Sequence, residues 1–442
     1  MVAVQRPNIL LIVLDSTRRD RLSTYGHPVP TTPQLDRIAA EGVVYEQCIT
    51  PGSWTLPSHA SLFTGLFPRD HHATVEHMKL DDRFLTLAEA LGTAGYETAG
   101  FTSNAWLSMG TGVEQGFDQW QDIWSMQPGY PDSGAALTNL RVLTWLGARR
   151  DRSRPFFMFI NYMETHMPYA PPPPYDKRYV PRDADPAMLA EIRSWKNPRE
   201  LGYLLKAPGF DVTPKQFELL LSQYDGELSY LDSRVGELTE ALRERGILDN
   251  TVLVITADHG EHFGEHGIMD HKMSLYDVLV HVPLIVRYRP GFPAGRRVRA
   301  QVQTIDIFPT LLRLGGAEGA LGPGLPVDDD HGPGRQYAFA EFAKPDVFID
   351  VMRQQFPQAD LARFNHSMTM VRGERFKYIW ASDGLEELYD IVADPLEQWD
   401  VGAAHPEILG ELRAELTRFR DGREAAVQES VAAVAAESAS SW

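Results

Sequence analysis

The sequence predicts an α/β protein in which a mostly parallel β-sheet is sandwiched by helices. Three apolar runs, over residues 9–14, 155–162 and 251–257, predict buried strands of that sheet. Continuous runs of Ile, Val, Leu and Phe suit strands that are covered on both faces, as strands of parallel sheets usually are. Helical patterns lie between these runs, and an alternation of strands and helices is typical of parallel sheets.

Local signals mark the other elements. Thr32 followed by Pro33 predicts the start of a helix, and Gly42 predicts its end. Helices are also expected over residues 85–91, 217–245 and 306–314, and short strands over residues 97–101 and 282–288.

The chain is expected to divide into three parts. Residues 1–330 form the catalytic domain, residues 331–424 a small C-terminal α+β subdomain, and residues 425–442 a flexible or helical tail. The Gly- and Pro-rich residues 317–335 are typical of a linker or surface excursion. Within the catalytic domain, residues 180–214 have weak periodicity and are interpreted as an inserted helical lid.

Charge and cysteine content exclude several function classes. Lys and Arg number 42 and Asp and Glu 60, which gives a formal net charge of −18. Sequence-independent nucleic-acid binding is therefore excluded, and an anionic substrate needs a metal or a cationic pocket. Cys48 is the only cysteine, which excludes an intrachain disulfide and a multi-cysteine zinc site.

We expect a cytoplasmic protein without a membrane partner. The apolar run at residues 9–14 is too short to cross a bilayer and lacks a signal-peptide cleavage site. The expected partner is an anionic small-molecule substrate, and the sequence indicates no particular oligomeric state.

Polar side chains follow three of the predicted strands. Asp15, residues 164–166, and the pair Asp258-His259 stand where these strands end. The carboxyl ends of parallel strands are where sites form, and a carboxylate beside an imidazole is suited to a divalent metal. The alternative is that Asp258 caps a helix and His259 is exposed, but the second carboxylate at a strand end, Asp15, favours the metal site.

Residues 53–65, SWTLPSHASLFTG, contain a candidate nucleophile. Pro57 and Ser58 suit the start of a helix, so Thr55 is expected just before its N-terminus. Free N–H groups and the helix dipole favour a tetrahedral anion there, and a metal-bound hydroxyl at this point is an activated nucleophile. Alternatively, Thr55 is only the N-cap of the helix.

Together these segments resemble the sulfatase family of the alkaline phosphatase superfamily. The resemblance covers nearly the whole chain. The motifs that follow the family's order are PNILLIVLDSTRRD, TTPQLDRIAAEGVVYE, TLPSHASLFTG, MFINYMETHMPYAPP, YDGELSYLD, TADHGE, HKMSLYDVLVHVPLIV, IDIFPTLL, GERFKYI and ELYDIVADPLEQ. The resemblance implies the alkaline phosphatase/sulfatase-like α/β fold, with a small C-terminal α+β subdomain.

The sequence departs from the sulfatase pattern at the site itself. The Cys or Ser that sulfatases convert to formylglycine is Thr55 here, so no formylglycine is expected. The Arg of the same signature is His59. Residues 102–105 stand where the family has Gly-Lys-Trp-His, so a sulfate-binding Lys and His are absent. The family's Asp-Asp pair is Asp15-Ser16, which removes one metal ligand.

These departures resemble the Thr-nucleophile members of the superfamily, which are of the lipoteichoic acid synthase type and the phosphodiesterase type. The resemblance implies one divalent ion, with Mn²⁺ favoured and Mg²⁺, Zn²⁺ or Ca²⁺ as alternatives. Its implied ligands are Asp15, Asp258, His259 and the Thr55 hydroxyl. A second ion, as in the two-metal phosphodiesterases, would need a further ligand set, for which the candidates are His262, His266 and Asp270.

The resemblance also implies catalytic roles outside the metal site. His166 matches a family His that contacts the transferred group and acts as a general acid, and Lys272 matches a Lys that bridges substrate and nucleophile. His271 can protonate the leaving group. The alternatives are a structural His166 beside Pro168 and a surface position for His271.

Three further residues are expected to bind substrate. Asn104 can donate to a phosphoryl oxygen, and His59 takes the place of the signature Arg. Arg18 is the third, and either it or Arg19 is expected to order the metal carboxylates.

The chemistry of threonine favours phosphorus over sulfur. A formylglycine hydrate expels sulfate by collapsing to an aldehyde, whereas a threonine ester must be attacked directly at phosphorus or sulfur. We therefore predict a metal-dependent hydrolase of phosphate monoesters, diesters or phosphonate esters that acts through a covalent Thr55 intermediate. The alternative is a phosphotransferase that passes the group to an acceptor alcohol in small-molecule biosynthesis. A true sulfatase or an inactive binding module is less favoured, the latter because the metal residues are intact.

Overall fold

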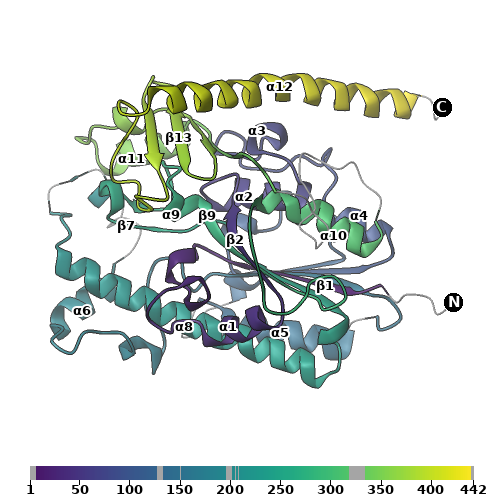
Figure 1. Cartoon of the computed structure of the whole chain (residues 1–442). Coiled ribbons are helices and arrows are strands. Elements are labelled where there is room, and N and C mark those ends of the chain that lie inside the picture. Colours follow the sequence, from purple (N-terminus) through teal and green to yellow (C-terminus); the bar gives the residue numbers. More distant parts are fainter. Residues whose placement is uncertain are drawn as a thin grey trace.

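The computed structural model describes residues 6–439 except 127–132, 150, 196–201, 205, 208 and 318–333. Its centre is an eight-stranded sheet with the strand order β10-β2-β9-β6-β1-β5-β3-β4 (Figure 1). The strands are β1 (Asn8–Leu14), β2 (Val43–Ile49), β3 (Glu97–Thr102), β4 (Gln119–Asp122), β5 (Phe156–Tyr162), β6 (Thr251–Thr256), β9 (His281–Arg287) and β10 (Arg296–Gln303). Only β9 runs antiparallel to its neighbours, so the prediction of a mostly parallel sheet is confirmed.

Helices cover both faces of this sheet, as predicted. One face carries α1 (Pro33–Ala40), α5 (Ala135–Thr144) and α8 (Pro214–Glu244), and the other carries α2 (Thr55–Thr64), α4 (Leu87–Thr93) and α10 (Ile307–Gly315) (Figure 1). Successive side chains of a strand point to opposite faces. Accordingly, Ile9 and Leu11 of β1 join one apolar cluster, whereas Leu10 and Ile12 join the other.

The predicted lid contains the short helix α6 (Pro186–Arg193) in its described part. Within residues 180–214, α6 packs against α8, and Ile192 and Trp195 join a separate apolar cluster with Leu219 and Leu220. Residues 196–201, 205 and 208 of this segment lie outside the described residues.

The C-terminal part is built on a second sheet. Its antiparallel strands are β11 (Ala338–Phe342), β12 (Met368–Arg372), β13 (Phe376–Ala381) and β14 (Glu386–Asp390), and it also contains α11 (Asp346–Gln355). The long helix α12 (Pro406–Ala439) packs on this sheet through Leu412 and Leu416. Since α12 is continuous across residue 424, no separate element begins at residue 425; the other domain boundary, at residue 330, lies outside the described residues.

A buried ion cluster joins this subdomain to the catalytic domain. Lys377 Nζ of β13 lies 2.9 Å from Asp277 Oδ1 and 2.8 Å from Glu397 Oε1. Arg372 Nε adds a contact of 3.0 Å to Asp277 Oδ2. All of these side chains are buried. Burial raises the pKa of Glu397 to about 7, although Lys377 opposes this. The cluster therefore depends on the Lys377 ammonium.

Replacing Lys377 with Met is expected to destabilise the fold strongly. The change leaves two buried carboxylates without their shared cation, and breaking a buried ion pair in this way costs about 3–5 kcal/mol. Urea unfolding of the full chain measures this loss. Arg353→Met is the control, because Arg353 and its partner Asp350 are 61% and 67% exposed, and ion pairs at the surface contribute little. Equal unfolding midpoints for the two variants would contradict the assignment.

Candidate active site

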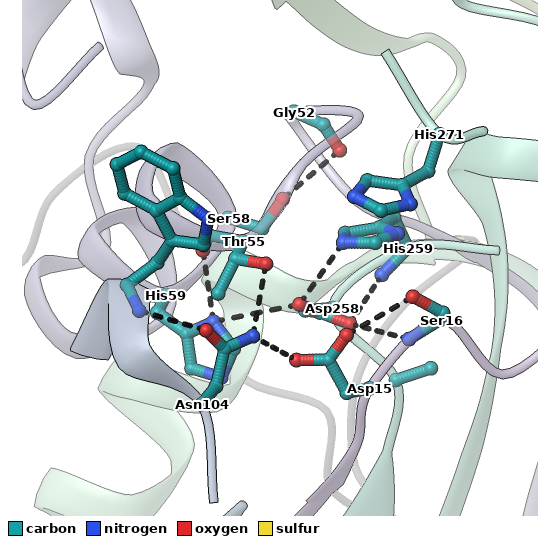
Figure 2. A network of polar contacts seen from close by, with 12 residues as sticks. Asp15, Ser16, Gly52, Thr55, Ser58, His59, Asn104, Asp258, His259 and His271 are labelled. Atoms are coloured by element: carbon teal, nitrogen blue, oxygen red, sulfur yellow. Dashed lines mark hydrogen bonds and ion pairs between the residues drawn. The ribbon is translucent and has the colours of Figure 1, made fainter. Parts of the chain in front are cut away.

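Two neighbouring strands bring the predicted metal residues together. Strands β1 and β6 are parallel and adjacent, and Asp15 follows β1 while Asp258 and His259 follow β6. The three side chains are buried and offer ligand atoms that all lie within 4.8 Å of one another. The structure thus assembles this set as expected (Figure 2).

The donor atoms of this set fit a divalent ion. His259 Nδ1 donates to the Gly260 carbonyl oxygen at 2.9 Å, which leaves Nε2 as the ligand atom. His259 Nε2 and Asp258 Oδ2 are buried, make no hydrogen bond and face each other at 3.2 Å. Burial alone would lower the pKa of His259, but the Asp258 carboxylate outweighs it and raises this pKa to about 9. Buried oxygen and nitrogen donors that favour positive charge are what a divalent cation takes.

Ser16 fixes the two carboxylates. Its N–H donates to Asp258 Oδ1 at 3.2 Å, and its hydroxyl donates to Asp15 Oδ1 at 3.0 Å. Its φ of 54° lies in the left-handed region, which is unusual for serine and is found at functional sites. Ser16 therefore positions the Asp15 and Asp258 carboxylates. It stands where other family members have a second Asp that is itself a metal ligand.

Thr55 lies at the N-terminus of α2 and is 1% exposed. The helix begins at Thr55 itself, with the extended residue Trp54 as its N-cap, so the predicted start was off by a turn or less. Asn104 Nδ2 donates to Thr55 Oγ1 at 3.3 Å and to Asp15 Oδ2 at 2.6 Å (Figure 2). One amide group thus connects the threonine hydroxyl to the metal carboxylates.

Two residues that were expected to bind substrate contact the site's own residues in this structure. Asn104 Nδ2 donates to both Thr55 and Asp15, so Asn104 orders the site. His59 is fully buried, and its Nδ1 donates to the Thr55 carbonyl oxygen at 2.9 Å. Its ring meets Phe159 edge-on at 5.7 Å. His59 therefore supports the first turn of α2 from the core side.

Arg18 is held by groups other than the candidate metal residues. Its guanidinium pairs with Asp20 at 2.8 Å and Glu265 at 2.6 Å, and donates to the Glu261 carbonyl oxygen at 3.2 Å. Among the described residues, none of its polar contacts is with Asp15 or with the other metal carboxylate, Asp258. Nearer carboxylates on the flanking loops hold it away from the metal carboxylates.

The predicted proton-transfer residues lie beside the metal residues. The rings of His259 and His271 stack at 4.4 Å with an interplanar angle of 20°, and His166 meets His271 at 4.9 Å. Lys272 Nζ lies 3.2 Å from His271 Nε2 and 2.9 Å from Asp270 Oδ1. Burial and then the Lys272 ammonium lower the pKa of His271. These residues form a continuous polar group that reaches the metal site.

Glu261 is a further buried residue of this site that was not predicted from the sequence. This residue is 1% exposed, and its Oε2 lies 3.2 Å from His271 Nδ1. Together with Asp270 and His271 it forms a second group of metal-type donors, and the Lys272 ammonium contacts the Asp270 carboxylate. Burial and then the charge of Asp270 raise the pKa of Glu261 well above its usual range. Its place in TADHGE, three residues after Asp258, was the available signal.

The ligand set suggested for a second ion does not assemble. His262 Nε2 is bonded to Ser274 Oγ at 2.7 Å, and the His266 ring stacks on Tyr276 at 3.5 Å. Neither imidazole joins Asp270, because each is held by a different neighbour.

The comparisons with known proteins agree with this architecture. The family model named Sulfatase matches residues 7–317. The multifunctional alkaline phosphatase superfamily protein PehA of Trinickia caryophylli is 26% identical over 470 residues, covering 89% of this chain and 90% of that protein. Arylsulfatase K of Bos taurus is 26% identical over 451 residues, covering 93% and 81%. The solved phosphonate monoester hydrolase of Agrobacterium radiobacter has a TM-score of 0.78 at 25% identity, covering 94% of this chain and 96% of that one.

None of the described helices combines the length and the apolar composition that a membrane crossing needs.

Proposed function

Because the chain belongs to the sulfatase family of the alkaline phosphatase superfamily, we propose that it hydrolyses phosphate or phosphonate esters through a covalent Thr55 intermediate. Family membership makes it a hydrolytic enzyme of this superfamily. The similarity to a phosphonate monoester hydrolase and to PehA supports phosphorus esters as its substrates.

The observation that carries the proposal is the side chain at the nucleophile position. Thr55 is buried at a helix N-terminus, and a single amide connects its hydroxyl to Asp15. A threonine ester cannot collapse to an aldehyde, so turnover requires direct attack on the bound group. Phosphorus supports such an attack, with transition-state charge spread over the oxygens.

Two displacements complete the proposed reaction. The Thr55 hydroxyl releases its proton to solvent and its Oγ1 forms a bond to phosphorus while the bond from phosphorus to the leaving oxygen breaks, and that oxygen takes a proton from the pair Lys272–His271. Water then attacks phosphorus and gives its proton back to that pair, the bond to Thr55 Oγ1 breaks, and the threonine oxygen recovers a proton from solvent. His166, whose ring lies beside that of His271, contacts the transferred oxygens in this reaction.

A divalent ion held by Asp15, Asp258, His259 and the Thr55 hydroxyl would lower the hydroxyl's pKa and offset negative charge on the transferred group. Mn²⁺ stays the favoured ion because of the resemblance to Thr-nucleophile members. The residues themselves orient Thr55 through Asn104 and fix both carboxylates through Ser16.

Sulfate ester hydrolysis is the second candidate. The similarity to arylsulfatase K, over nearly the whole chain, favours it as a class. The threonine argues against it, because a sulfothreonine lacks the aldehyde route that releases sulfate from formylglycine.

A substrate panel tests the proposal. Nitrophenyl phosphate monoesters and diesters, a phosphonate monoester and a sulfate are each assayed with Mn²⁺, Mg²⁺, Zn²⁺ or Ca²⁺, with and without an acceptor alcohol. We expect metal-dependent release of nitrophenol from at least one phosphorus ester, at a rate well above that from the sulfate. A sulfate turned over fastest would contradict the proposal, and a phosphorylated alcohol as the main product would indicate a transferase.

A further inference from the structure

Three aromatic rings stand next to the nucleophile. Trp54 directly precedes Thr55 and is 3% exposed. Its ring lies 6.0 Å from that of Trp106 and 5.6 Å from that of Phe348, at interplanar angles of 87° and 75°. The three rings come from the loop before α2, from the segment after β3 and from α11, so segments far apart in the sequence converge on this point.

Hydrogen bonding and charge tie this aromatic group to the reacting centre. The backbone N–H of Trp106 donates to Asn104 Oδ1 at 2.8 Å, and the same Asn104 donates to Thr55 Oγ1 through its amide nitrogen. Lys272 Nζ lies 5.9 Å from the centre of the Phe348 ring. The backbone of Trp106 is thus tied to the residue that supports the nucleophile, and the Phe348 ring lies near the cation of the proton-transfer group.

The outer part of this group is exposed and apolar. Trp106 is 41% exposed and the neighbouring Met109 is 69% exposed. On α11, Val347 and Val351 are 47% and 45% exposed and lie on the same side of the helix, next to Phe348. Large apolar side chains that gather at the surface beside a site mark a binding surface.

We propose that Trp54, Trp106 and Phe348 form the subsite for the leaving group and that this subsite selects a flat apolar ring, as in an aryl ester. This inference rests on the proposed ester hydrolysis and names its substrate class. Trp54 meets both neighbours edge-on, and Trp106 is 41% exposed, so a flat ring of a substrate can pack against Trp106 from solvent. The C-terminal subdomain takes part in recognition through Phe348.

Truncating the exposed ring tests the subsite. In the metal-loaded full chain, Trp106→Ala is expected to lower kcat/KM for a phenyl ester about tenfold, because ring stacking and apolar burial are lost. The methyl ester of the same phosphonate, whose leaving group does not reach the rings, is expected to change less than about twofold. Trp106→Phe keeps a ring and is expected to keep most of the preference. Phe348→Leu keeps the apolar volume and is expected to lose part of it.

The control is Trp399→Ala, which removes a tryptophan that is 71% exposed and follows β14 in the C-terminal subdomain. Its ratio of phenyl to methyl ester activity is expected to match the wild type. Equal losses on both esters in Trp106→Ala, or a wild-type preference for a linear hexyl ester over the phenyl ester, would overturn the subsite. If the wild type turns over no ester at all, the proposed function has failed instead. The subsite is then judged by calorimetric binding of phenyl and methyl esters, and equal affinities would refute it.

Discussion

Replacing Thr55 with Ala is expected to lower kcat toward the best phosphorus ester by roughly 10³–10⁶-fold, because the whole covalent path is lost. Thr55→Ser is expected to retain a substantial part of the activity, since it keeps a hydroxyl at the N-terminus of α2. Steady-state kinetics of the metal-loaded variants measure both effects. Bound metal is quantified in parallel, so that a lost ligand is distinguished from a lost nucleophile.

Stereochemistry and mass separate this mechanism from its rivals. Two in-line displacements at a chiral phosphorus give net retention, whereas direct attack by water gives inversion. Inversion together with an active Thr55→Ala variant would show that the hydroxyl is only a ligand.

The wild-type peptide of residues 53–59 is expected to have the mass of unmodified threonine, even after co-expression with a formylglycine-generating enzyme. An aldehyde there would restore the sulfatase interpretation.

The central strands were predictable because burial on both faces leaves a clear pattern. β1, β5 and β6 are continuous apolar runs, and each was predicted within about one residue of its bounds. The edge strand β10 was missed, because its sequence RRVRAQVQ contains few apolar residues and no continuous apolar run, and its first half is mostly exposed. The orientation of β9 was not predictable either, since an apolar strand looks the same in either direction and only its pairing with β2 and β6 makes it antiparallel.

The grouping of the three candidate metal residues was predictable for a similar reason, whereas the contacts of the residues around them were not. Asp15, Asp258 and His259 follow strands whose ends must meet in a parallel sheet. The contacts of Asn104 and His59 depend on side-chain directions in three dimensions, so the sequence assigned them to substrate when the structure turns them toward Thr55. The cytoplasmic location stays a prediction.

Removing a ligand of the predicted ion is expected to abolish both metal binding and turnover. Asp258→Ala and His259→Ala each delete a donor of the buried set, and activity is expected to fall by roughly 10³-fold or more, as expected when a metal stabilises transition-state charge. Both residues follow the carboxyl end of β6 and lie outside the strand itself, so we expect circular dichroism spectra like that of the wild type. Elemental analysis is expected to give about one ion per wild-type chain and almost none in the variants.

His266→Ala is the matched control for the metal variants. His266 belongs to the same segment, but its ring stacks on Tyr276 and its Nε2 donates to the Leu396 carbonyl oxygen, away from Asp15. This variant is expected to keep the ion and most of the activity. Unchanged metal content in both Asp258→Ala and His259→Ala would refute the ligand set. If the wild type holds two ions and Glu261→Gln loses one of them, the group Glu261, Asp270 and His271 would be assigned to a second ion. That ion must then compete with the Lys272 ammonium for the Asp270 carboxylate.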